Sequence, residues 1–265
     1  MSSQSKPQGF LYLVPTPLDF GCALSDTPSL DLVLPRETLE TASRLTHWIS
    51  ENAKSTRAFL KRVNAVCALS VPLQEQNIVE LPRQAHKKGD HTPTGRSDAV
   101  ATNLLAPALA GHDVGLVSEA GMPAVADPGS SVVRAAHAAG LEIRPLTGPV
   151  SLMLAMAASG LNGQDFAFVG YIPQEPAQRA RRLRELESLA LRSGQTQIFI
   201  ETPYRNSTLL QALLQVLQPQ TRLAVSCGLG LPAQVTRSAP VKQWRTKGLA
   251  DQLPLNLPAV FLLGP

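Results

Sequence analysis

Short apolar runs alternate with longer mixed segments along the first half of the chain. Five runs have the length and composition of buried strands: residues 10–14, 44–49, 77–81, 112–118 and 141–146. The segments between them predict helices at residues 36–43, 55–63, 97–109 and 130–139. Ser97 can cap the third helix, and Gly140 suits the left-handed position that ends the fourth. Strands that alternate with helices indicate a mostly parallel sheet covered on both faces.

The alternation continues to the C-terminus. Further strands are expected at residues 166–172, 195–201, 222–226 and 259–263, and helices at residues 150–159, 177–193 and 205–217. Gly160 is expected to end the first of these helices. The corner Thr147-Gly148-Pro149 separates the two halves, so we predict α/β domains at residues 9–147 and 148–265.

Composition limits the possible classes of protein. With 265 residues, 44% hydrophobic and 17% charged, the chain can bury a sizeable core and is not disordered. The aromatic content of 5% argues against a nucleic-acid surface built from stacking platforms. The net charge of +4 suits an anionic substrate or RNA without requiring one.

Cysteines and termini point to a cytoplasmic protein. Cys22, Cys67 and Cys227 are far apart and form no CxxC pair, so neither a disulfide framework nor a metal site is indicated. The first nine residues lack the apolar stretch of a signal peptide. The most apolar run, residues 150–158, is too short to span a bilayer, so no membrane association is expected.

Four loops that follow predicted strands carry the candidate chemistry. The dinucleotide motif G-x-G-x-x-G, the phosphate-binding P-loop and the G-x-S-x-G elbow are all absent. The loops are VPTP (14–17), SEAGMPAVADPG (118–129), TGPVS (147–151) and ETPYR (201–205). Each loop alone has the proline and hydroxyl residues that are common in tight turns. Together, at the carboxyl ends of strands, they predict a polar cofactor held through backbone groups.

These segments resemble a known family. LYLVPTP, VGLVSEAGMPAVADPG, AAGLEIRPLTGPVSLMLAMAASGL, FVGYIP and FIETPYR are similar to motifs of the tetrapyrrole-methylase superfamily of S-adenosylmethionine-dependent methyltransferases. The similarity is greatest to the branch that methylates a cytidine 2′-oxygen in 16S ribosomal RNA. It runs from about Phe10 to Leu263 and is densest over residues 112–173.

The resemblance implies two α/β/α domains, with a mostly parallel sheet in the first and a mixed sheet in the second. It also implies a homodimer, with S-adenosylmethionine in a cleft between the domains. The residues that it implies for cofactor binding are Pro15, Glu119, Ala120, Gly121, Met122, Pro123, Val125, Ala126, Asp127, Val150 and Ser151. A glycine such as Gly121 lets backbone approach a ligand closely, and a carboxylate suits the cofactor's positive charges.

The chain departs from the family on the substrate side. The family's A-E-D-T-R is here S-E-N-A-K (50–54), and its H-N-E cluster falls on residues 95–97, where it is lost. The family's late R-E-L-T-K-x-x-E run falls on residues 227–234, which carry no charge. The change from S-D-A-G to S-E-A-G is milder, and Glu201 and Arg205 are kept. This pattern predicts a diverged member that keeps the cofactor and has a changed substrate or a reduced activity.

The leading hypothesis is methyl transfer, with Glu51, Lys54 and Glu201 as candidate bases or orienting groups. Glu201 and Arg205 could instead form a structural ion pair. The acceptor could be ribosomal RNA, with the small ribosomal subunit as partner, or a small molecule such as a tetrapyrrole. A binding protein that has lost catalysis is the remaining alternative.

Two basic segments could contact RNA. The arginines of residues 177–184 suit phosphate contacts, but a solvated helix face with Glu185 and Glu187 as intrahelical partners is favoured. The segment HKKGDH (86–91) could face RNA or form a mobile polar loop.

Overall fold

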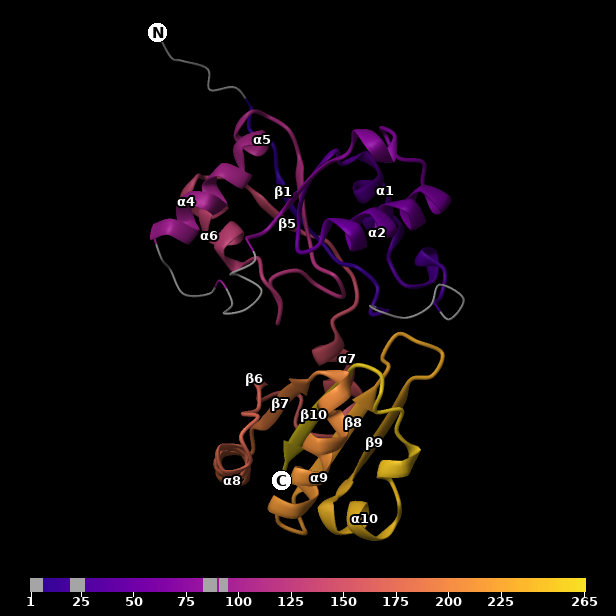
Figure 1. The fold of residues 1–265 in the computed structure, drawn as a ribbon, viewed down its shortest axis with the longest axis vertical. Coiled ribbons are helices and arrows are strands. Elements are labelled where there is room, and N and C mark those ends of the chain that lie inside the picture. Colours follow the sequence, from indigo (N-terminus) through magenta and orange to yellow (C-terminus); the bar gives the residue numbers. More distant parts are fainter. Residues whose placement is uncertain (1–6, 20–26, 83–89, 91–94) are drawn as a thin grey trace. The chain divides into compact units, whose positions relative to one another are not determined.

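The computed structural model describes residues 7–19, 27–82, 90 and 95–265. The chain divides into two compact units (Figure 1). Among the described residues, unit 1 comprises Pro7–Asp19 and Pro28–Pro149, and unit 2 comprises Thr27 and Val150–Pro265.

Unit 1 is built on a five-stranded sheet in which all neighbouring strands are parallel. The sheet order is β3-β2-β4-β1-β5. The strands are β1 (Leu11–Val14), β2 (His47–Ser50), β3 (Asn77–Glu80), β4 (Val114–Val117) and β5 (Ile143–Pro145). The prediction of a parallel sheet in this half is confirmed.

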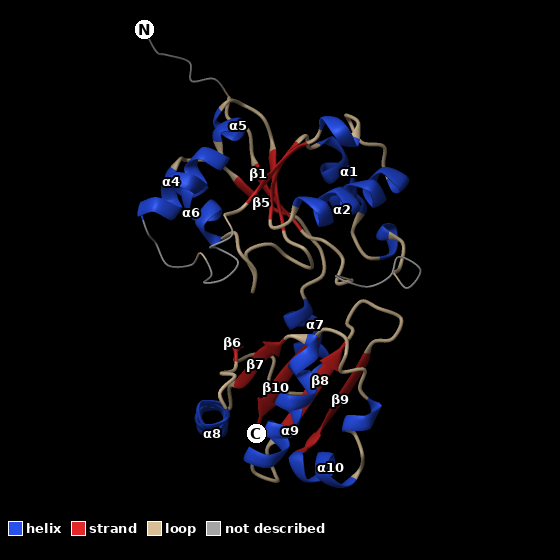
Figure 2. Ribbon diagram, viewed as in Figure 1, coloured by secondary structure: helices blue, strands red, loops and turns tan. Residues whose placement is uncertain are grey.

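Helices cover both faces of the unit 1 sheet (Figure 2). They are α1 (Arg36–Arg44), α2 (Ala53–Val66), α4 (Gly95–Leu104), α5 (Ala106–Leu109) and α6 (Ser130–Ala138), with short 3-10 turns at Leu30–Leu32 and Leu73–Glu75. One core joins α1 and α2 to the sheet through Leu39, Phe59 and Trp48. The opposite core joins α4, α5 and α6 to it, with Leu116 and Val132 fully buried.

The central strand β4 is buried along its whole length, which explains its unbroken apolar sequence. Gly115 is required there, because a Cβ atom on it would lie 2.7 Å from the ring of Trp48. The indole of Trp48 donates to the Gln76 side chain at 2.9 Å, so the polar edge of this buried ring is satisfied.

Unit 2 contains a mixed five-stranded sheet of order β6-β7-β10-β8-β9. Only β6 and β7 pair in parallel, and the other neighbours are antiparallel. The strands are β6 (Phe166–Tyr171), β7 (Thr196–Glu201), β8 (Arg222–Cys227), β9 (Val235–Pro240) and β10 (Ala259–Gly264). The mixed sheet expected from the resemblance is therefore confirmed.

In unit 2 also, helices lie on both sides of the sheet. The helices are α7 (Ser151–Ser159), α8 (Pro176–Ser193), α9 (Asn206–Val216) and α10 (Val241–Thr246), with 3-10 turns at Pro203–Arg205 and Ala250–Gln252. One face packs on α8, α9 and α10 around the stacked rings of Phe199 and Phe261. The other packs on α7 through Leu152 and Ala155.

The structure corrects one predicted helix and adds two elements that were not predicted. The helix expected over residues 97–109 is two helices, α4 and α5, with a break at Leu105. Pro107 explains the break, because its ring carries no N–H and clashes with the preceding turn. The elements β9 and α10 were not predicted. For β9 the reason is that Val235–Pro240 contains no apolar run, because it forms a half-buried edge strand.

The predicted glycine ends are confirmed, with φ of 69° at both Gly140 and Gly160. Of the predicted cysteine thiols, Cys67 is half-buried and Cys227 buried, and both are free, whereas Cys22 lies outside the described residues. No helix within the described ranges is both long and apolar enough to cross a membrane.

Candidate functional site

Three neighbouring strands of unit 1 end at the same level. Val117 at the end of β4 pairs in parallel register with Val14 of β1 and Ser50 of β2. The chain leaves β1 toward the face that carries α1, whereas it leaves β4 toward the face that carries α6. Adjacent strands whose connections leave to opposite faces create the usual ligand crevice of a parallel sheet.

The first proline loop is hydrogen-bonded to the long loop after β4. The N–H of Thr16 donates to the carbonyl of Gly121 at 2.9 Å, and the N–H of Gly121 returns a bond at 3.1 Å. The hydroxyl of Thr16 also donates to the Ser118 carbonyl. Gly121 has a φ of 81°, a left-handed conformation that favours glycine. The predicted loops at residues 14–17 and 118–129 therefore form one surface.

The glycine-proline corner packs against the same proline. A Cβ atom on Gly148 would lie 2.3 Å from Cγ of Pro15, so only glycine fits. The hydroxyl of Thr38 donates a hydrogen bond to the carbonyl of Thr147 at 2.8 Å. Three of the four predicted loops are thus joined within unit 1, as far as Pro149.

Three carboxylates gather at this end of the sheet. Glu51 directly follows β2, and its Oε2 accepts the N–H of Glu119 at 3.1 Å. Burial, together with the negative charges of Glu51 and Glu119, raises the pKa of Asp127 to about 7. The three acids are therefore close enough to repel one another, and a positively charged ligand would relieve this repulsion.

The loop that carries these acids has a strained backbone. Ala124 and Ala126 have φ of 63° and 66°, values that cost a non-glycine residue about 1–2 kcal/mol each. Along the same loop, Ala120 and Met122 are half-buried, Pro123 is buried, and Val125 and Ala126 are exposed. Strain of this kind persists only where surrounding contacts fix the chain.

The far end of this loop is held by a residue that the sequence patterns did not identify. Asp90 accepts hydrogen bonds from the N–H of Gly129 at 2.9 Å and from the N–H and hydroxyl of Ser131 at 3.0 and 2.7 Å. Burial alone would raise the pKa of Asp90, but these hydrogen bonds hold it below its usual value. Asp90 belongs to the segment predicted to be a mobile loop or to face RNA. It is instead buried, whereas its neighbours 86–89 and 91 lie outside the described residues.

The changed motif after β2 has a structural explanation. Asn52 caps α2, because its side-chain oxygen accepts the N–H groups of Lys54 and Ser55. An amide caps a helix as well as the carboxylate that the family has at this position. The side chain of Lys54 is exposed on the first turn of α2.

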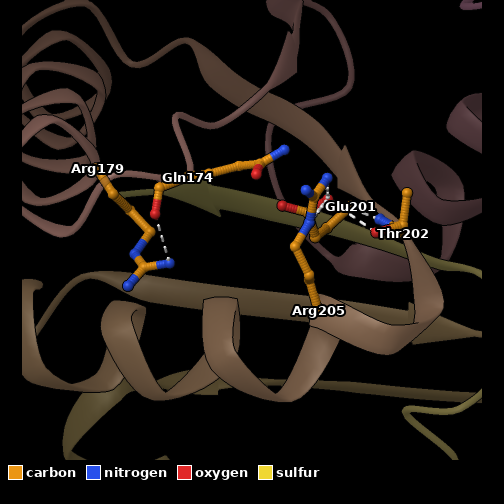
Figure 3. A network of polar contacts seen from close by, with 5 residues as sticks. All are labelled: Gln174, Arg179, Glu201, Thr202 and Arg205. Carbon is orange, nitrogen blue, oxygen red and sulfur yellow. Dashed lines mark hydrogen bonds and ion pairs between the residues drawn. The ribbon is translucent and has the colours of Figure 1, made fainter.

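The remaining predicted site residues belong to unit 2. Val150 precedes α7 and packs in the core beneath it, and Ser151 is the first residue of that helix. Figure 3 shows Glu201 at the end of β7, where its Oε1 accepts Arg205 at 2.6 and 2.9 Å and the N–H of Thr202 at 2.7 Å. This is the ion pair weighed as the alternative role of Glu201 and Arg205.

The arginine-rich helix α8 presents a charged face. Arg181 and Arg182 both pair with Glu185, at 3.3 and 3.5 Å. The prediction that Glu187 pairs with arginines along the helix is wrong. Glu187 is buried and accepts the N–H of Gln218 at 2.7 Å. In Figure 3, Arg179 reaches the carbonyl of Gln174 at 3.5 Å.

Comparisons with known proteins agree on one family. Residues 36–244 match the family described as Tetrapyrrole (Corrin/Porphyrin) Methylases. The chain is 27% identical over 248 residues to the ribosomal RNA small subunit methyltransferase I of Vibrio cholerae, covering 91% of this chain and 73% of that protein. It is 30% identical over 175 residues to the protein of the same name from Pseudomonas aeruginosa, covering 66% and 58%. With a Xylella fastidiosa relative of that name, 36% identical over 119 residues, the match covers 45% of this chain and 42% of the relative.

Solved structures show the same fold. The methyltransferase CobJ superposes with a TM-score of 0.53 at 20% identity, covering 97% of this chain and 94% of that one. A uroporphyrin-III C-methyl transferase from Thermus thermophilus, complexed with S-adenyl homocysteine, gives a TM-score of 0.53 at 16% identity, covering 97% of both chains. The predicted fold class is confirmed.

Proposed function

The chain belongs to the tetrapyrrole (corrin/porphyrin) methylases, and we propose that it transfers a methyl group from S-adenosylmethionine to ribosomal RNA. The predicted family and the predicted class of enzyme, a methyltransferase, are confirmed by this membership. The acceptor is proposed from the relatives, which are named for methylation of small-subunit ribosomal RNA.

The cluster of three carboxylates at the ends of β2 and β4 is the observation that carries the proposal. S-adenosylmethionine bears a sulfonium and an ammonium group, and both are attracted to Glu51, Glu119 and Asp127. The hydroxyl of Ser118 is buried and has no hydrogen-bond partner within the described ranges, so it can bond a polar ligand. The residues present therefore fit the cofactor.

The bound cofactor would supply a methyl group already activated by its positively charged sulfur. The chain then has to bind the cofactor and the acceptor, align them, and remove a proton from the acceptor hydroxyl. The two hydrogen bonds between Gly121 and Thr16 and the packing of Gly148 on Pro15 hold the loops of this site against one another. These contacts support the cofactor role that we propose for the 118–129 loop.

Glu51 is our choice among the three candidate bases. It lies beside Glu119 and Asp127, so it is in the cluster that would face the cofactor. Glu201 is engaged by Arg205 and Thr202, which suits a residue that shapes its loop (Figure 3). Lys54 is exposed and free to approach a phosphate as a point charge.

RNA as the acceptor has support from the charge of the chain. The net charge is +4, and α8 contributes four arginines within residues 179–184. Two of them share one acid, Glu185, so positive charge remains in excess on this helix. A cytoplasmic location and a homodimer form part of the same proposal, the latter testable by sedimentation.

Transfer of a labelled methyl group tests the proposal. The purified protein is incubated with methyl-labelled S-adenosylmethionine and 30S subunits from cells in which its gene is deleted. Label in 16S RNA is the expected result. Subunits from wild-type cells should take up no label, because their RNA already carries the methyl group. Label in a tetrapyrrole instead would identify the alternative substrate, and cofactor binding without transfer to either would indicate lost catalysis.

The variant Glu51→Gln tests the base. It should lower the single-turnover rate by about 10²-fold or more while RNA binding is unchanged. The matched change Glu185→Gln on α8 should leave that rate unchanged, and a normal rate in Glu51→Gln would contradict the role.

A further inference from the structure

The loop that carries Asp127 is fixed at two points. Near its start, Gly121 is bonded in both directions to Thr16. At its end, the N–H of Gly129 is bonded to the carboxylate of Asp90. Between these points lie the two alanines with positive φ, Ala124 and Ala126. A strained segment keeps such a conformation only while both ends are held.

Asp90 is held in this position by burial and by hydrogen bonds. Its exposed fraction is only 7%, and its carboxylate receives three hydrogen bonds from residues 129–131. Its own carbonyl accepts a bond from Arg134 at 2.9 Å, one turn further along α6. The negative charge also lies at the N-terminus of α6, where the helix dipole favours it. Both the side chain and the backbone of Asp90 therefore attach to the start of this helix.

We propose that Asp90 is a positioning residue that holds the 122–129 segment in the strained conformation needed to place Asp127 beside Glu51 and Glu119. It touches neither cofactor nor acceptor in this proposal, and it acts through Gly129. Without its carboxylate the N–H groups of Gly129 and Ser131 lose their partner, and the two alanines can relax toward negative φ. The consequence for cofactor binding rests on the proposed function, whereas the consequence for the loop does not.

Hydrogen exchange of the cofactor-free protein tests the loop directly. In Asp90→Ala, amides of residues 119–129 should exchange faster than in the wild type, and added formate should slow them again by replacing the missing carboxylate. Asp113→Ala is the matched control, because Asp113 also accepts a distant backbone N–H, that of Phe10, but at the amino end of β4. It should leave exchange of the loop unchanged.

Cofactor affinity is the second readout. Asp90→Ala should bind S-adenosylmethionine about tenfold to a hundredfold more weakly, since small misplacements of a binding group have effects of this size. Formate should restore part of the affinity, and Asp113→Ala should bind like the wild type. If Asp90→Ala fails to fold, Asp90→Asn keeps the shape and one acceptor oxygen, and a smaller loss of the same kind is expected.

Unchanged exchange in the loop of the Asp90 variant, or equal acceleration in the Asp113 variant, would overturn the proposal. If the wild type binds no S-adenosylmethionine, the proposed function fails, but the exchange experiment still decides the role of Asp90.

Discussion

Replacing Asp127 by asparagine should make the protein more stable and its cofactor binding weaker. The pKa of Asp127 lies at about 7 in the folded protein, against 3.8 for an ordinary aspartate. Between these two pH values the folded state holds a proton that the unfolded chain has lost. The free energy of unfolding of the wild type therefore falls as pH rises from about 4 to about 7.

The size of the effect follows from the same shift. At about 1.4 kcal/mol per pH unit, ionised Asp127 costs the folded state about 4 kcal/mol relative to the unfolded chain. Because part of the side chain is open to solvent, water screens this cost, and we expect about 2 kcal/mol in the measurement. The amide of the variant carries no charge at any of these pH values, so the advantage of Asp127→Asn should be near zero at pH 4 and complete above pH 7.

The two tryptophans allow a clean assay. Trp48 is buried in unit 1 and Trp244 in unit 2, so Trp244→Phe leaves a fluorescence signal from unit 1 alone. Urea unfolding of this background, with and without Asp127→Asn, would be followed between about pH 4 and pH 8. A variant that is less stable at pH 8, or a difference that does not change with pH, would refute the reasoning.

Three further substitutions test the packing around the site and elsewhere. Gly148→Ala should lose about 1–3 kcal/mol of stability, because its Cβ would overlap the Pro15 ring, whereas Gly163→Ala, with nothing within 4 Å, should be tolerated in the same thermal melts. Asn52→Ala should cost about 1 kcal/mol in urea unfolding through loss of the α2 cap, and Asn52→Asp should not; equal losses would rule out capping. Glu187→Ala should cost about 1–3 kcal/mol by leaving the N–H of Gln218 without its partner, against less than about 0.5 for the exposed Arg181→Ala; similar values for the two would contradict the buried role of Glu187.

The strands and loops of the site were predictable because their signals are local. The run that becomes β4 is apolar throughout, and the glycines and prolines that follow it mark a shaped loop. Parallel strands place such loops at one edge of the sheet, and the pairing of β1 with β4 then brings residues 14–17 and 118–129 together.

What the sequence did not reveal depends on contacts between distant residues. Asp90 is one acid in a polar stretch, and only its bonds to residues about 40 positions later give it a role. The pKa of Asp127 is raised by burial and then by the charge of Glu51, a residue 76 positions earlier that directly follows β2. The strand β9 was missed because an edge strand can be polar on both faces.

Calorimetric titration with S-adenosylmethionine tests the central claim most directly. The wild type should bind one cofactor per chain, and Glu51→Gln and Asp127→Asn should each weaken binding by about tenfold, or about 1.4 kcal/mol. Glu185→Gln, a loss of the same charge on the exposed face of α8, should bind like the wild type. No binding by the wild type, or equal affinity in all four proteins, would contradict a cofactor site built on these carboxylates.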